Sequence, residues 1–109
     1  MSRQKGNAAE EKAAAFLRQE GFALIERNFY AKKMGELDII AQKEDVLHFI
    51  EVKSGSGFDP VYNLTPAKLH KVIKSAQLYM KQKGLDMPFC IDALIVRDEE
   101  IELLENITL

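Results

Sequence analysis

The chain has 109 residues, of which 47% are hydrophobic and 29% are charged, as in an ordinary globular protein with one core. Its formal net charge is -2 and its sequence pI is about 5.7, so it lacks the overall basic charge of a typical nucleic-acid-binding domain. No apolar run approaches the roughly 20 residues of a membrane span, and no apolar signal core follows the N-terminal residues 1–6. We therefore expect a single domain over residues 1–109, located in the cytoplasm.

Cys90 is the only cysteine, and it stands in the apolar run Phe89-Cys90-Ile91. A single cysteine excludes a disulfide framework and a cysteine-zinc site within one chain. Because free cysteine is usually buried, we expect a structural thiol. His48 and His70 have no neighbours at metal-ligand spacing, so both are expected to be structural or solvated.

The first predicted element is a helix over residues 7–20, because apolar residues form one stripe along it and Gly21 is placed to end it. That stripe consists of Ala9, Ala13, Phe16 and Leu17. Residues 22–30 form a mixed apolar run that is either a strand or a bent extended segment. Residues 31–35 then resemble a turn.

Two strands are predicted over residues 37–42 and 46–53, and the short polar connection between them is typical of an antiparallel hairpin. Residues 54–60 follow directly and are rich in glycine, serine and proline, which indicates a loop. Since this loop leaves the sheet directly after Lys53, we expect it to lie over any site that this lysine serves.

A second helix should begin with Thr65 as N-cap and Pro66 at the first helical position, and should end before Gly84. Its apolar face is expected to contain Leu69, Val72, Ile73, Ala76, Tyr79 and Met80. The opposite face carries His70, Lys71, Lys74 and Lys81. A strand over 89–96, a turn over 97–100 and a short strand over 101–104 complete the chain. This order predicts an α/β fold with a helix on either side of a central mixed sheet.

Asp38, Glu51 and Lys53 are the strongest candidates for a functional site. Alternation along a strand puts Glu51 and Lys53 on one face, and Asp38 would join them if the two strands pair with it on that face. Carboxylates are ligands for Mg²⁺, which can act as Lewis acid and activate water. The alternative is a solvated acid at the sheet edge together with an ion pair of little energetic value.

Two stretches carry a family resemblance, Gly35-Glu36-Leu37-Asp38-Ile39-Ile40 and Phe49-Ile50-Glu51-Val52-Lys53. They resemble the PD-(D/E)xK nuclease signature and, more narrowly, the YraN-like family of uncharacterised small bacterial proteins. That family is similar to archaeal Holliday-junction resolvases, and its members are generally described as predicted endonucleases. The resemblance extends to Ala9-Glu10, Gly21-Phe22, Arg27-Asn28 and Asp92.

The resemblance implies a restriction-endonuclease-like αβββαβ core and a metal-dependent endonuclease that cuts DNA, with branched or damaged DNA as candidate substrates. It implies Mg²⁺ or Mn²⁺ bound by Asp38 and Glu51, and water positioned by Lys53. Glu10 is implied as a further metal ligand that assists catalysis, and its alternative is a solvated acid favoured by the helix N-terminus. Glu36 is expected at the edge of the site.

The expected partner is nucleic acid, and Lys71, Lys74 and Lys81 are the candidate phosphate contacts. A solvated helix face is the alternative for these lysines. A homodimer is compatible with the likeness to resolvases. Two rival functions stay open. One is a non-catalytic module that keeps the nuclease fold and binds nucleic acid or protein, which the acidic pI and the absence of two arginines usual in the family would suit. The other is a protein that binds metal for stability alone.

Overall fold

The computed structural model describes residues 7–55 and 65–107. Its elements, in chain order, are α1 (Asn7–Gln19), β1 (Ala23–Tyr30), the short 3-10 helix η2 (Lys32–Met34), β2 (Glu36–Lys43), β3 (Val46–Ser54), α2 (Pro66–Lys83), β4 (Phe89–Arg97) and β5 (Glu100–Leu104). The five strands form one sheet in the order β1-β2-β3-β4-β5. Strands β3 and β4 are parallel, whereas the other neighbouring pairs are antiparallel. The predicted mixed α/β fold is confirmed, and its element order is compatible with a restriction-endonuclease-like core.

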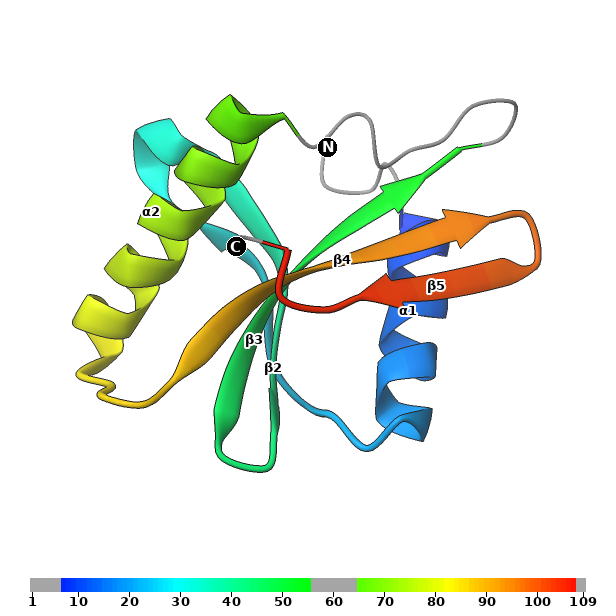
Figure 1. The fold of residues 1–109 in the computed structure, drawn as a ribbon, viewed down its shortest axis with the longest axis horizontal. Helices are drawn as coiled ribbons and strands as arrows, with labels where there is room; N and C mark the ends of the chain where they lie inside the picture. Colours follow the sequence, from blue (N-terminus) through cyan, green and yellow to red (C-terminus); the bar gives the residue numbers. More distant parts are fainter. Residues whose placement is uncertain (1–6, 56–64, 108–109) are drawn as a thin grey trace.

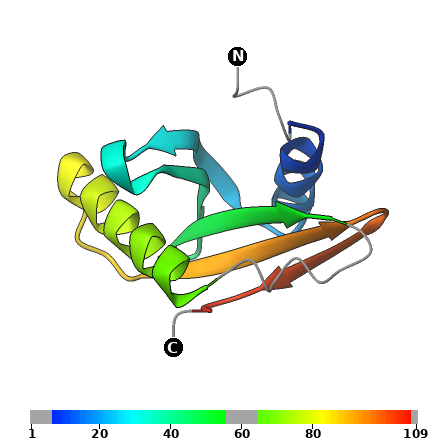
Figure 2. The ribbon, with the colours of Figure 1, turned by 90° about the horizontal axis from the view of Figure 1, so that it is seen from above.

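The two helices cover opposite faces of the twisted sheet, as Figure 1 shows and Figure 2 shows from a second direction. On the α2 side, the core contains Leu37, Ile40, Leu47, Phe49, Val72, Ala76, Tyr79 and Ile91. On the α1 side, it contains Ala13, Leu17, Phe22, Ile39, Ala41, Ile50, Leu94 and Val96. The strands are therefore buried on both faces, and a charged side chain among them needs a specific reason to be there.

Local signals account for both ends of α2 and for the C-terminal end of α1. The Thr65 hydroxyl accepts a hydrogen bond from the Lys68 amide at 3.2 Å, which caps the start of α2. Gly84 ends that helix in the left-handed region with a φ of 65°. After α1, the Phe22 amide donates to the Leu17 carbonyl at 2.9 Å, and Gly21 has a φ of 95°. The predicted helices and their caps are confirmed.

Strands β2 and β3 form the predicted hairpin, with a turn at Glu44 and Asp45. Their backbone pairing extends from Lys43 and Val46 at the turn to Ile39 and Ile50. Residues 37 and 40 both pack on the α2 side of the sheet, so strict alternation fails near Asp38. Hence Asp38 lies where β2 begins to leave β3, and an argument from alternation does not fix the face that it occupies.

The uncertain run over residues 22–30 is a strand in the structure, β1, with an irregular register between Leu24 and Glu26. Most of the predicted loop over residues 54–60 lies outside the described residues. No helix within the described residues is long and apolar enough to cross a membrane.

Candidate metal and nucleic-acid site

Asp38 and Glu51 are tied to each other's strands where β2 and β3 separate. The Val52 amide donates to Asp38 Oδ2 at 2.9 Å. In the opposite direction, the Asp38 backbone hydrogen-bonds to the Glu51 carboxylate. Each acid therefore satisfies a backbone group near the end of the regular pairing. This exchange holds both carboxylates at the junction of the two strands.

One oxygen of the Glu51 carboxylate has no partner among the residues that the structure describes. Glu51 is only 8% exposed, and its Oε2 atom is buried without a hydrogen bond to any group in residues 7–55 and 65–107. A buried acceptor of this kind usually costs about 1–3 kcal/mol. A divalent cation would satisfy this oxygen, and carboxylate oxygens are the ligands that Mg²⁺ prefers in proteins. The residues present therefore fit a metal bound by Asp38 and Glu51.

Both carboxyl groups hold their protons more tightly than free acids do. Burial raises the pKa of Glu51 to about 8, the charge of Asp38 adds to the rise, and Lys53 opposes it. Burial also raises the pKa of Asp38 to about 6, with contributions from Glu10 and Glu36, against the Val52 hydrogen bond and Lys53. A bound cation stabilises the ionised forms of two carboxyl groups most strongly when these groups lie close together and are shielded from water.

Lys53 lies beside Glu51 in a pocket of about 140 Å³ between β3 and the start of α2. The lining residues are Met34, Glu36, Glu51, Lys53, Lys68, Lys71 and Val72. Two acids and three lysines thus surround one small cavity. Such a mixture suits a negatively charged ligand that also contacts a metal.

Glu10 lies near the acids, but its own contacts are with an arginine. Its Oε1 accepts from Arg27 Nη2 at 3.4 Å, and Arg27 also pairs with Glu11 at 3.0 Å. The charge of Glu10 still contributes to the raised pKa of Asp38. Glu10, Asp38 and Glu51 do not converge as a three-ligand cluster in the described residues. Metal binding by Glu10 stays a prediction.

The lysines of α2 do not all face the pocket. Lys71 lines it, whereas Lys74 and Lys81 are exposed and are absent from its lining. Lys68 also lines it, and this residue was not among the predicted phosphate contacts. A signal was available, because residues three apart on a helix lie side by side and Lys68 stands three positions before Lys71. Nucleic-acid binding by these lysines stays a prediction.

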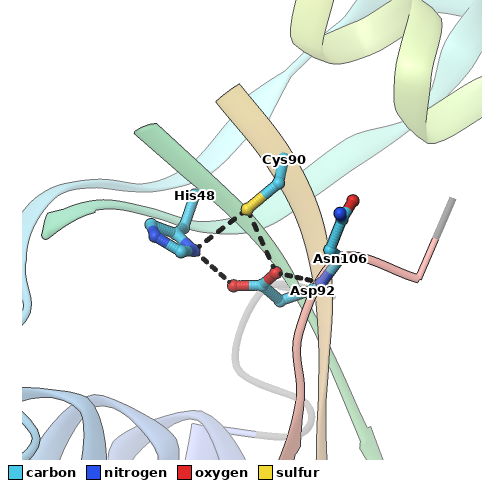
Figure 3. A network of polar contacts seen from close by, with 4 residues as sticks. All are labelled: His48, Cys90, Asp92 and Asn106. Atoms are coloured by element: carbon cyan, nitrogen blue, oxygen red, sulfur yellow. Dashed lines mark hydrogen bonds and ion pairs between the residues drawn. The ribbon is translucent and has the colours of Figure 1, made fainter. Parts of the chain in front are cut away.

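A separate polar cluster lies on the α1 side of the sheet and corrects one expectation, that for Cys90 (Figure 3). His48 Nδ1 lies 2.6 Å from Asp92 Oδ2 and 3.2 Å from Cys90 Sγ, so His48 is a buried histidine with polar partners, in line with the structural role expected as one of its two alternatives. Cys90 is only half-buried, and its thiol donates to Asp92 Oδ1 at 3.4 Å. The apolar sequence around Cys90 suggested a thiol in the core, but its side chain points toward polar groups of its own and the neighbouring strand.

Comparisons with known proteins place the chain among uncharacterised relatives. Residues 9–96 match the model of the "Uncharacterised protein family UPF0102". A UPF0102 protein of Wolinella succinogenes is 62% identical over 109 residues, which cover 100% of both chains. One from Sulfurovum sp. is 62% identical over 105 residues, 95% of this chain and 93% of the relative. Another from Helicobacter pylori is 58% identical over 106 residues, 97% and 92% of the two chains.

Proposed function

The chain belongs to the uncharacterised protein family UPF0102, and we propose that it is a divalent-metal-dependent endonuclease that hydrolyses phosphodiester bonds in DNA. The observation that carries this proposal is the buried Glu51 Oε2 beside Asp38 and Lys53, which no group in the described part of the chain satisfies. The resemblance to PD-(D/E)xK nucleases gives the same three residues the same roles. Branched or damaged DNA is the substrate class that the likeness to resolvases favours.

Asp38 and Glu51 would hold Mg²⁺ or Mn²⁺ through their carboxylate oxygens. When bound, the ion acts as a Lewis acid and lowers the pKa of coordinated water. Lys53 lines the same pocket as Glu51, so its ammonium group can position the attacking water or stabilise negative charge on the phosphate. Because cations would neutralise both acids, an anionic substrate would meet less electrostatic repulsion at the site.

Lys68 and Lys71 supply the binding side of the proposal. They belong to the first turns of α2 and line the pocket that contains Glu51 and Lys53. Positive side chains around one acidic, metal-binding centre suit a phosphodiester, because phosphate contacts supply most of the affinity for nucleic acid. The overall acidic pI is no obstacle when the basic groups gather at the site.

The test is cleavage of linear, nicked, flapped and four-way-junction DNA, and of RNA, in Mg²⁺ or Mn²⁺. We expect the wild type to cut at least one DNA form, and Asp38→Asn, Glu51→Gln and Lys53→Ala each to lose at least about 100-fold in rate. Glu99→Gln is a matched control, because it makes the same change at an exposed turn residue. Chelation of the metal should abolish cutting by the wild type.

Equal cutting by the wild type and Lys53→Ala would identify a contaminating nuclease and remove the role of Lys53. If the wild type binds Mg²⁺ and DNA without cutting any substrate, the non-catalytic binding module replaces the enzyme. Metal binding without affinity for nucleic acid would instead leave a purely stabilising ion. Sedimentation of the same samples would test the expected homodimer.

A further inference from the structure

We propose that His48, Cys90 and Asp92 form a second metal site, which binds one borderline-soft divalent cation of the Zn²⁺ class. The site lies away from the Asp38 and Glu51 carboxylates in both position and chemistry. It requires neither cleavage nor DNA binding, so it can be tested whether or not the protein is a nuclease.

The fold brings three kinds of metal donor to one point between β3 and β4. In the parallel register, His48 pairs with Cys90 and Ile50 pairs with Asp92. Cys90 and Asp92 are two positions apart on β4, so both side chains lie on the same face of the sheet as that of His48. An imidazole nitrogen, a thiol sulfur and a carboxylate oxygen lie within 4.8 Å of one another. Figure 3 shows the three side chains pointing toward a common centre.

The contacts of the imidazole favour a cation over a catalytic relay. A thiol-imidazole-carboxylate relay needs the thiol on one ring nitrogen and the carboxylate on the other. Here Cys90 Sγ and Asp92 Oδ2 both approach the same atom, His48 Nδ1. In the metal-free protein the Nδ1 proton can serve Asp92 while the Cys90 thiol donates to Asp92 Oδ1, and a cation in place of these protons can accept an electron pair from all three groups. The 2.6 Å between Nδ1 and Oδ2 is a hydrogen-bond length, so ligation would open it slightly.

Burial and support of the ligands are those of a built site. Asp92 is fully buried and His48 is 8% exposed, while Cys90 is half-buried and leaves a route from solvent. The backbone amide of Asn106 donates to Asp92 Oδ1 at 2.9 Å. The ring of Phe22 packs edge-on against the imidazole of His48, with 4.9 Å between the two ring centroids. These neighbours fix the carboxylate and the ring, as the groups that contact metal ligands do around bound metals.

The ligand set distinguishes this site from the one on the other face. Nitrogen, sulfur and oxygen together suit Zn²⁺ or Co²⁺, whereas the all-oxygen pair Asp38 and Glu51 suits Mg²⁺ or Mn²⁺. His48 contacts Phe22 on the α1 side, while Glu51 lines a pocket with α2. A single cysteine argued against a zinc site in the sequence. That exclusion holds for a site made of several cysteines, whereas here the sheet places a histidine and an aspartate beside the one cysteine.

Co²⁺ titration of the reduced protein tests the proposal directly, because Cys90 is the only cysteine. Any thiolate-to-cobalt charge-transfer band must therefore come from this residue. We expect one Co²⁺ per chain to give that band, with displacement by Zn²⁺. Cys90→Ser should abolish it, and His48→Gln should weaken Co²⁺ binding by more than the roughly 10- to 100-fold that is lost when a group that only orients a ligand is removed.

Glu51→Gln is the control, since it alters the other acidic site and should leave the cobalt band unchanged. Circular dichroism of each variant would establish that it is folded. A folded wild type without a charge-transfer band would overturn the proposal. It would also fail if the band persisted unchanged in His48→Gln, because the thiolate would then bind Co²⁺ without the imidazole. A stoichiometry of one ion per two chains would contradict it as well, because the proposed site lies within a single chain.

Discussion

At the scale of single residues, Glu51 should control how the stability of the metal-free protein depends on pH. Its pKa is about 8 in the folded protein and near 4.5 in a free chain. Between these values the folded state binds more protons than the unfolded state, so the free energy of unfolding falls as pH rises. The raised pKa of Asp38 acts in the same direction at lower pH.

Glu51→Gln should therefore flatten this pH dependence. We expect the variant to be more stable than the wild type near pH 8 by about 1–3 kcal/mol, because it removes the buried charge that Glu51 acquires as pH approaches its raised pKa. Urea unfolding in chelator, from about pH 5 to about pH 8.5, would measure the effect. Glu99→Gln should follow the wild type. A wild type that grows more stable over this range, in parallel with Glu51→Gln, would contradict the prediction.

Asp38 combines two roles that different substitutions can separate. Its side chain accepts from the Val52 amide, and an asparagine oxygen could still do so. Asp38→Asn should thus stay close to the wild type in stability and lose metal binding. Asp38→Ala should lose metal binding and also about 1–3 kcal/mol of stability, since the amide is left without its partner. Urea unfolding together with Mg²⁺ calorimetry would distinguish the two variants, and equal stability of both would remove the structural role.

At the scale of elements, the lysines of α2 offer a matched pair of double variants. Lys68 and Lys71 line the pocket with Glu51, while Lys74 and Lys81 belong to the same helix and do not. Removing either pair lowers the charge of the helix by the same amount. Fluorescence anisotropy with DNA at several salt concentrations would compare the two variants.

We expect the Lys68→Ala/Lys71→Ala variant to reduce the slope of log affinity against log salt by about 2, roughly 0.9 for each lost phosphate contact. The Lys74→Ala/Lys81→Ala variant should change it much less. Equal losses would mean that the helix acts as a general charged surface. In that case the pocket would have no special role in binding.

The same helix shows what local sequence can and cannot predict. Thr65 and Gly84 mark its ends through capping chemistry that depends only on near neighbours, and both ends were predicted. Whether Lys68 lines the pocket depends on how α2 is placed relative to β3, which no local sequence pattern encodes. Asp38 was predicted as a site residue because Glu51 and Lys53 follow it on the next strand. Its position, however, depends on the separation of β2 from β3, where the alternation of side chains fails.

At the scale of the whole molecule, the parallel pairing of β3 and β4 explains why the cluster of His48, Cys90 and Asp92 could not be predicted from the sequence. His48 and Asp92 are 44 positions apart, and their contact depends on the register that the α2 crossover sets between the two strands. Spacing rules for metal ligands act within short segments, so they could not detect this cluster. The pairing also gives β3 two chemically different faces, with Glu51 and Lys53 toward α2 and His48 toward α1.

The final prediction joins the fold to its acidic site through Mg²⁺. A cation that binds only the folded state stabilises it, by about 2.7 kcal/mol when its concentration is 100 times the dissociation constant. Because the metal must displace protons from Asp38 and Glu51, whose pKa values are raised, we expect a larger rise in melting temperature near pH 8 than near pH 5.5. Asp38→Asn and Glu51→Gln should abolish the rise, and Cys90→Ser should retain it because Mg²⁺ prefers oxygen ligands. An equal rise at both pH values, or one that persists in Glu51→Gln, would show that Mg²⁺ stabilises the protein from somewhere else.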